Sequence, residues 1–151
     1  MTHLKSFATS LLSCALAIGV LASAPAAAAQ SSTTTVKVDV PFAFRTASQL
    51  MPAGIYRIDL MSDHTILLRG AGSHAATFVM VHAATASKAP SKGAVVFDRY
   101  GNNYYLHQIW TQGDNSGREC SKSKAEKETL QAQNSQPPTL VEVALLDDTR
   151  R

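Results

Sequence analysis

The stretch that decides the fold is Val36-Lys37-Val38-Asp39-Val40-Pro41-Phe42-Ala43-Phe44-Arg45. Its valines and phenylalanines share one parity, and the charged residues, Pro41 and Ala43 share the other. Such alternation predicts a strand with one buried face. Because Pro41 has no N–H to donate to a ladder, we expect this strand to lie at a sheet edge, or to be bent or bulged there.

Similar patterns recur along the chain. They predict further strands over 55–61, 65–69, 76–81, 94–100, 104–111 and 139–146. Gly70-Ala71-Gly72-Ser73 and Gly101-Asn102-Asn103 are typical hairpin turns. The 76–81 strand is apolar on both faces, which predicts a central position in the sheet.

One segment predicts a helix. Ser123 and Glu126 have the spacing of a capping box, so a mostly polar helix over about 124–133 is expected to dock weakly or to lie across a surface. Residues 83–93 predict a loop and 112–118 a turn. The fold class is therefore mainly β: a small antiparallel β-sandwich or barrel of about seven strands, with one short polar helix near the C-terminus.

The N-terminus predicts a secretory signal. Lys5 precedes an uncharged apolar run over 7–22, and small residues follow up to Ala29. This order is typical of a cleavable signal peptide, so we expect removal of residues 1–29 and a periplasmic or secreted protein. The apolar run is shorter than the ~20 residues that span a bilayer, so no stable membrane span is expected after cleavage.

Two other fates of this segment stay open. The signal could be retained as a membrane anchor. Alternatively, Leu11-Leu12-Ser13-Cys14 is similar to a lipoprotein cleavage box, with Cys14 as the lipidated residue. Cleavage there would leave an apolar tail on the mature protein, which favours the cut before Gln30.

The remaining chain suits one domain. Removing residues 1–29 from the 151-residue chain leaves 122 residues, enough for a single core. We expect a polar lead-in over 30–35, one β domain over 36–146 and a polar tail over 147–151. The charges are interspersed, whereas a nucleic-acid binder usually concentrates basic residues on one face. Nucleic acid is therefore excluded as a partner, and an envelope protein or surface component is the expected kind.

Cys120 is the one cysteine after the signal, so no disulfide is expected within the mature chain. The polar run 117–124 around it makes burial doubtful. An incidental or structural thiol, an intermolecular disulfide and a reactive nucleophile all stay open. A catalytic thiol would also need a neighbouring His and an orienting group.

Several motifs resemble a known family. Val-Asp-Val-Pro-Phe-Ala-Phe over 38–44 and Leu-Met-Pro-Ala-Gly-Ile-Tyr-Arg-Ile over 50–58 are similar to the opening of an uncharacterised family of small exported β-rich proteins of soil bacteria. Val-Phe-Asp-Arg-Tyr-Gly over 96–101, the Tyr-Tyr-Leu and Ile-Trp that follow, and 117–126 extend the resemblance over most of the mature chain. These are turn and core residues, so the resemblance implies a fold but no activity or site residue. The family more often has Pro where Cys120 stands, which argues against a catalytic thiol.

Histidines give no metal-site motif. His64, His74, His82 and His107 follow the signal, and no pair has a recognised metal-ligand spacing. We expect them to be exposed or singly hydrogen-bonded, with a site formed by strand pairing as the alternative. No cofactor and no catalytic residue is assigned.

The most polar and aromatic cluster flanks one predicted hairpin. Its members are Asp98, Arg99, Tyr100, Tyr104, Tyr105 and His107. Cross-strand neighbours in a hairpin lie ~5 Å apart, so these side chains could simply stabilise it. A binding patch with exposed tyrosines is the second interpretation. Acid–base catalysis by Asp98 and His107 is the third, and it requires a suitable register.

The sequence leaves three functional classes. The first is a non-enzymatic extracytoplasmic binding or structural protein. The second is a carrier whose barrel encloses a lipophilic ligand, which requires an apolar cavity of ~300 Å³ or more. The third is an uncharacterised hydrolase-like enzyme, which requires titratable side chains to converge in a cleft.

Overall fold

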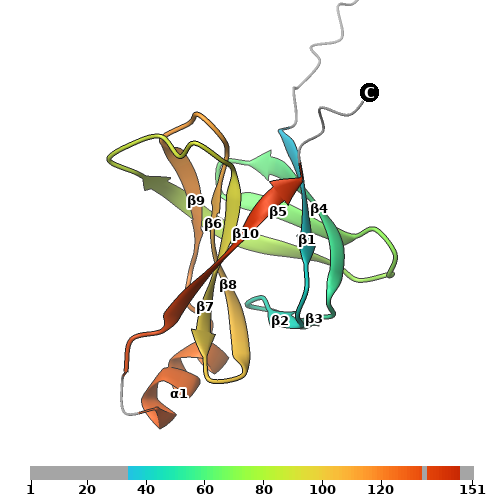
Figure 1. The fold of residues 1–151 in the computed structure, drawn as a ribbon. Helices are drawn as coiled ribbons and strands as arrows, with labels where there is room; N and C mark the ends of the chain where they lie inside the picture. The colour runs from blue at the N-terminus through green and yellow to red at the C-terminus, as the bar shows by residue number, and fades with distance from the viewer. Residues whose placement is uncertain (1–33, 134–135, 147–151) are drawn as a thin grey trace, which may run out of the picture. The chain divides into compact units, whose positions relative to one another are not determined.

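The computed structural model describes residues 34–133 and 136–146, so the predicted signal, most of the lead-in and the 147–151 tail lie outside the described residues. The described part contains ten strands and one helix (Figure 1). The helix, α1, spans Lys124–Ala132, close to the predicted 124–133. The strands are β1 (Thr35–Val40), β2 (Phe44–Arg45), β3 (Leu50–Met51), β4 (Gly54–Ser62), β5 (Thr65–Gly70), β6 (Ala76–Thr85), β7 (Ala94–Tyr100), β8 (Asn103–Trp110), β9 (Ser116–Cys120) and β10 (Thr139–Leu146).

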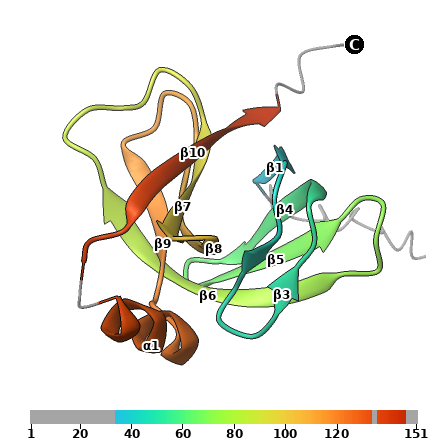
Figure 2. The ribbon, with the colours of Figure 1, turned by 60° about the horizontal axis from the view of Figure 1, so that its bottom comes forward.

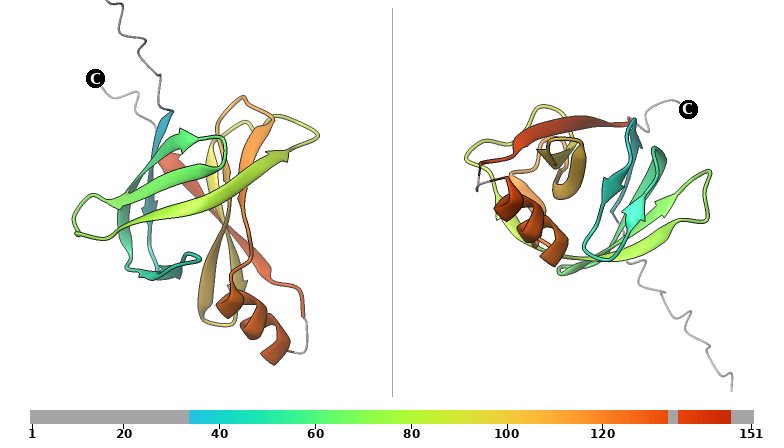
Figure 3. Two further views of the ribbon diagram at one scale, coloured as in Figure 1. Left: turned by 180° about the vertical axis from the view of Figure 1, so that it is seen from behind. Right: turned by 90° about the horizontal axis from the view of Figure 1, so that it is seen from below.

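Eight strands close into an antiparallel barrel. Their order around the ring is β8-β7-β10-β1-β4-β5-β6-β9, and β9 returns to β8 through the pairs Gln108↔Glu119 and Ile109↔Arg118. Figure 2 and the right-hand view of Figure 3 show the strands and α1 from the lower end. The predicted antiparallel β fold with a short C-terminal helix is confirmed, and the barrel is the form it takes. Closure leaves these eight strands without a free edge.

Pro41 ends the first strand. β1 stops at Val40, and Phe44 begins the two-residue strand β2. Since β1 pairs with both β10 and β4, it is not an edge strand. Of the two alternatives predicted for Pro41, the edge position is wrong, and the departure from a regular strand takes the form of a break between β1 and β2.

The chain after Pro41 crosses one end of the barrel. β2 pairs with β8, which lies three places from β1 around the ring. Phe42 stacks on Tyr104 with ring centroids 3.9 Å apart, and Phe44 meets Tyr56 and Phe97 edge-on at 5.2 Å each. These aromatic contacts fill this end of the barrel with apolar area.

The barrel interior is packed with alternate side chains of its strands. The buried core consists of Val38, Val40, Phe44, Met51, Tyr56, Ile58, Ile66, Leu68, Val79, Val81, Val95, Phe97, Leu106, Ile109 and Cys120. Val141, Val143 and Leu145 of β10 pack against it. The core therefore takes up much of the space that an enclosed lipid would need.

The strand β9 was not predicted, and it raises the barrel from the expected seven strands to eight. Its sequence, Ser-Gly-Arg-Glu-Cys, has no apolar alternation and falls partly in the predicted 112–118 turn. Gly117 is buried under Trp110: a Cβ there would lie 2.5 Å from Trp110 Cε3. Cys120 pairs with Val81 and is 6% exposed, so the doubt about its burial is corrected. Burial raises the pKa of this thiol to about 12, which makes it a poor nucleophile.

The strand β6 has neighbours on both sides, β5 and β9, as its apolar sequence predicted. Its outer face is nevertheless not covered, because Phe78 and Met80 are 64% and 68% exposed. Among the described residues, no helix has the length and hydropathy that crossing a membrane requires.

Candidate functional site

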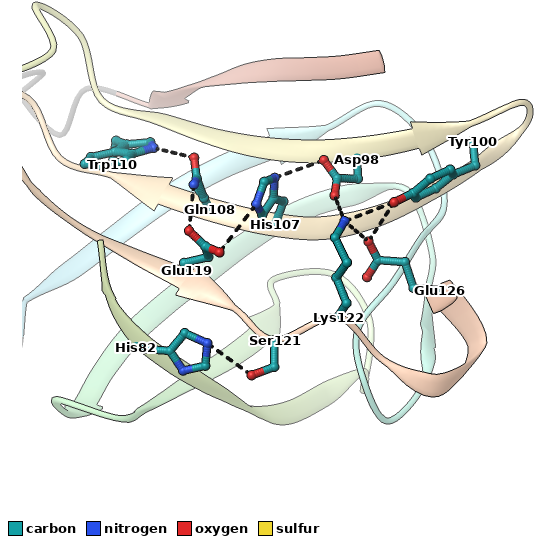
Figure 4. A network of polar contacts seen from close by, with 10 residues as sticks. All are labelled: His82, Asp98, Tyr100, His107, Gln108, Trp110, Glu119, Ser121, Lys122 and Glu126. Atoms are coloured by element: carbon teal, nitrogen blue, oxygen red, sulfur yellow. Dashed lines mark hydrogen bonds and ion pairs between the residues drawn. The ribbon is translucent and has the colours of Figure 1, made fainter. Parts of the chain in front are cut away.

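The outer face of β7 and β8 carries a buried polar cluster. Alternation along β7 places Val95 and Phe97 in the core, so Asp98 and Tyr100 point outward. These two side chains are nevertheless only 1% exposed, since the chain from β9 into α1 folds over them (Figure 4). Asp98, Tyr100, His107, Lys122 and Glu126 are called the Asp98 cluster below.

Asp98 lies at the centre of this cluster. Its Oδ1 is 2.9 Å from His107 Nδ1, and its Oδ2 accepts a hydrogen bond of 2.6 Å from Lys122 Nζ. The contact with His107 has an ion-pair distance, but the ring N–H is not aligned for a hydrogen bond.

A bulge brings His107 to Asp98. The register shifts between Val96 and Phe97, which face Gln108 and Leu106 respectively. His107 is therefore the extra residue in β8. A bulge re-aims a side chain that regular alternation would place elsewhere. Asp98 itself faces Tyr105, so the two titratable groups meet without being register partners.

The ammonium of Lys122 joins three acceptors. Besides Asp98, it donates to Tyr100 Oη at 3.0 Å and to Glu126 Oε1 at 2.9 Å. Tyr100 Oη in turn donates to Glu126 Oε1 at 3.2 Å. A lysine has three N–H donors, and here each has an oxygen partner.

The helix α1 docks through polar contacts rather than through an apolar face. Glu126 is its buried residue, at 4% exposed. Ser123 Oγ accepts from Glu126 N at 3.1 Å, which confirms the predicted N-cap. Tyr105 and Thr129 share a hydroxyl hydrogen bond of 2.8 Å. The sequence predicted a mostly polar helix that docks weakly or lies across a surface, and it did not predict that the carboxylate of Glu126 is buried against Lys122 and Tyr100.

These contacts set the protonation states. Burial would raise the pKa of Asp98, but the contacts with His107 and Lys122 outweigh it and lower the pKa to about 2. The carboxylate of Asp98 raises the pKa of His107 more than burial lowers it. Burial lowers the pKa of Lys122, yet its bonds to Asp98, Tyr100 and Glu126 raise it overall. Asp98 and Lys122 are therefore both charged at neutral pH.

A chain of side chains continues from His107 along β8 and β9. His107 Nε2 lies 3.9 Å from Glu119 Oε1, and Gln108 Nε2 donates to Glu119 Oε2 at 3.0 Å. Trp110 Nε1 donates to Gln108 Oε1 at 3.2 Å. His82 Nε2 on β6 and Ser121 Oγ, directly after β9, are 3.1 Å apart. Figure 4 shows that this pair lies apart from the Asp98 cluster.

The six residues singled out from the sequence are divided between two places. Asp98, Tyr100, Tyr105 and His107 lie on the outer face of the barrel. Tyr104 instead stacks on Phe42, and Arg99 donates to Gly101 O at 2.8 Å with its guanidinium 5.5 Å from the Tyr104 ring centre. The exposed tyrosine surface expected of a binding patch is absent here, because Tyr100 and Tyr105 are only 1% and 3% exposed.

The Asp98 cluster has little room for a substrate. A void of about 10 Å³ touches Glu126 and Tyr105, and this is the size of a single water site. Among residues 34–133 and 136–146, no three His, Cys, Asp or Glu side chains are grouped to hold a metal ion. His64, His74 and His82 are exposed. The charged groups of the cluster instead connect α1 to the barrel, because Lys122 bonds both Asp98 on β7 and Glu126 in α1.

A second site lies at the end of the barrel opposite the aromatic residues. A pocket of about 220 Å³ opens there, and sequence reasoning missed it because its walls come from five different strands. We call it the barrel mouth. Its lining includes one cation, Arg118, and five apolar side chains: Val36, Ile58, Leu60, Ile66 and Ile109. A wider hollow of about 510 Å³ adjoins it and shares Val36 and Thr111 with it.

Arg118 is the unusual residue of the barrel mouth. Its Nη1 donates to Gly117 O at 3.2 Å, and its Nη2 lies 3.5 Å from Asp63 Oδ1. The Nε atom is buried and has no hydrogen-bond partner among the described residues. Buried N–H groups are normally paired, so this one marks a place where a further acceptor would be stabilised.

Comparison of the chain with protein-family models, with curated proteins and with solved structures finds no match in any of the three. The resemblance to a family of small exported β-rich proteins therefore stays a prediction.

Proposed function

We propose that this protein is a non-enzymatic, exported binding domain that takes the apolar end of a small ligand into the barrel mouth. The observation that carries the proposal is a pocket with five aliphatic side chains in its lining at the open end of an otherwise filled barrel. Apolar concave sites with few polar groups are the usual form of small-molecule sites.

The volume limits what the pocket holds. At about 220 Å³ it is smaller than the roughly 300–1,000 Å³ of typical ligand sites. The packed core below it leaves little space for a whole lipid. The proposal is therefore narrower than the carrier considered from the sequence: one short alkyl end enters the pocket, and the rest of the ligand stays outside.

The test is binding of a short alkyl probe. We expect n-hexanol and n-hexanoate to shift the methyl NMR signals of Ile58, Ile66 and Ile109 in a saturable way. A dissociation constant of about 1 mM or tighter is expected, equivalent to about 4 kcal/mol. Burial of several CH₂ groups at ~0.8 kcal/mol each supplies this after the cost of association.

A matched pair of variants locates the site. Leu60→Phe fills the barrel mouth and should abolish the saturable shifts. Leu67→Phe makes the same change on β5, outside the pocket lining, and should leave binding intact. Equal binding by both variants, or no saturable shift in the parent protein, would contradict the proposal.

Export is a separate part of the proposal, supported by the order of charge, apolar run and small residues at the N-terminus. Expression of the full chain in a bacterium should give a processed protein outside the cytoplasm. N-terminal sequencing should read from Gln30. A full-length band confined to the cytosol would overturn this part and leave the binding proposal standing.

A further inference from the structure

The guanidinium of Arg118 is poorly neutralised at the barrel mouth. Its ion-pair contact is with Asp63, at 3.5 Å, and that carboxylate side chain is 87% exposed. Such an exposed, long contact contributes little. Asp114, the acidic residue that lines the pocket, accepts instead from Ser116 N at 2.8 Å. Arg118 therefore keeps donors and charge for a further partner.

Two of the donor nitrogens of Arg118 that lack a close partner, Nε and Nη2, lie on one edge of the guanidinium. Nε has no partner, and Nη2 has only the loose contact with Asp63. Nε–H and the Nη2–H beside it point the same way, and together they match the two oxygens of a carboxylate. The third nitrogen, Nη1, is already engaged by Gly117 O.

We propose, on the basis of the proposed function, that the ligand of the barrel mouth is a small apolar monocarboxylate whose acid group pairs with this edge of Arg118. The alkyl part then lies against Ile58, Ile66 and Ile109, and the ligand carboxylate takes the place of Asp63. Because Nε is covered, pairing requires the Arg118 side chain to rotate until this edge faces the pocket. Asp63 is exposed and can give way to the ligand.

The charges of the site favour a monoanion. Arg118 is the cation that lines the pocket, while Asp114 lines it and Asp63 lies at its edge. A cationic ligand would face Arg118, and a dianionic phosphate ester would face the two carboxylates with one cation to offset them. One carboxylate therefore suits the site better than either alternative.

The experiment compares four probes of equal chain length at pH 7. These are n-hexanoate, n-hexanol, n-hexylammonium and n-hexyl phosphate, each titrated by NMR and calorimetry against the 30–151 protein and its variants. We expect hexanoate to bind at least fivefold more tightly than hexanol, and the other two to bind more weakly than hexanoate.

Variants then assign the preference. Arg118→Gln should remove the preference for hexanoate over hexanol, while Arg118→Lys should keep part of it. Arg99→Gln, at an arginine that contacts Tyr104 instead, should change nothing. Circular dichroism checks that each variant is folded.

The outcomes separate the two proposals. Equal binding of hexanoate and hexanol by the parent protein would overturn the carboxylate inference and leave the proposed function intact. Tighter binding of hexyl phosphate, or a preference that survives in Arg118→Gln, would also overturn it. Absence of binding by all four probes would overturn the proposed function and the inference together.

Discussion

Asp59 and Asp98 are both 1% exposed, yet they are buried in different ways. Each belongs to the outer face of a barrel strand. Asp59 on β4 accepts hydrogen bonds from Arg57 Nε at 2.7 Å, from Arg69 Nη2 at 2.8 Å and from the Thr35 hydroxyl at 2.7 Å. These partners lie on β4 itself and on the two strands beside it.

Asp98 takes its partners from further away. Lys122, which donates to it at 2.6 Å, lies in the segment between β9 and α1, 24 residues along the chain. The same lysine reaches Glu126 in α1. The carboxylate of Asp98 is thus a point at which the helix is attached to the barrel.

The partners of the two aspartates also differ in how far water can reach them. Arg57 and Arg69 have side chains that are 54% and 52% exposed, so water can solvate them if Asp59 is lost. Lys122 and His107 are 37% and 20% exposed and are held against other protein groups. Loss of Asp98 therefore leaves charged and polar groups with less access to water, which is the costly case.

The largest effect is expected for Asp98→Asn. Removing one partner of a buried ion pair typically costs 3–5 kcal/mol. Lys122 is partly exposed and keeps Glu126 and Tyr100, so we expect a loss of about 3 kcal/mol in the free energy of unfolding. Urea denaturation measures this loss. Relative to the parent protein, Asp98→Asn should also speed up amide hydrogen exchange more across Lys124–Ala132 than across β5.

Asp39→Asn is the matched control for that variant. Asp39 is an exposed aspartate on β1, and its replacement should change the unfolding free energy by no more than about 0.5 kcal/mol. A cost for Asp98→Asn as small as that of the control would show that the Asp98 cluster does not hold the helix.

A smaller effect is expected for Asp59→Asn. Pairs with exposed arginines contribute roughly 0–1 kcal/mol each, and the asparagine can still accept from Thr35. We expect a loss of about 1 kcal/mol in urea denaturation, with no selective change in exchange of α1. The loss should shrink in 1 M salt, where screening acts over about 3 Å. A loss equal to that of Asp98→Asn would remove the distinction between the two aspartates.

Local pattern predicted most of the barrel strands, but not how the ring closes. Seven barrel strands carry apolar alternation or apolar runs that the sequence displays. β9 does not, because its buried positions are filled by Gly117 under Trp110 and by Cys120. The burial of Gly117 depends on the Trp110 ring of the adjacent strand β8, so the residues of β9 themselves do not indicate it.

The two sites were predictable to different degrees. Asp98, Tyr100, Tyr105 and His107 were grouped correctly because they flank one hairpin. Lys122 and Glu126 were missed as partners, since a return of the chain over 22 or more residues cannot be placed from spacing. Their position just before and within a capping box was the available signal.

The barrel mouth had no comparable signal. Its aliphatic walls are ordinary core positions until the ring closes, and Arg118 stands in an apparent turn. The segment after Pro41 fills the end of the barrel that it crosses. The sequence does not indicate which end this is.

The smallest effect concerns pH and His107. The contact with Asp98 raises the pKa of His107 above its ordinary 6.5, so protonation stabilises the fold fully below pH 6.5. That contribution is lost as the pH rises through the folded pKa. Asp98 acts with the opposite sign: its pKa is lowered from 3.8 to about 2, so its contribution is complete above pH 3.8 and is lost as the pH falls toward 2. These two groups therefore favour maximal stability between pH 3.8 and 6.5.

His107→Gln tests the predicted loss of stability as the pH rises through the folded pKa of His107. Urea denaturation from pH 5 to 9 should show a decline in the parent protein, of less than about 1 kcal/mol, that is reduced in the variant. His74→Gln, at an exposed histidine in the β5–β6 turn, should keep the decline. If His107→Gln retained the parent decline, His107 would not be charged within the Asp98 cluster. The cluster would then depend on Lys122 alone, and the contrast with the two arginines of Asp59 would narrow to a difference in burial.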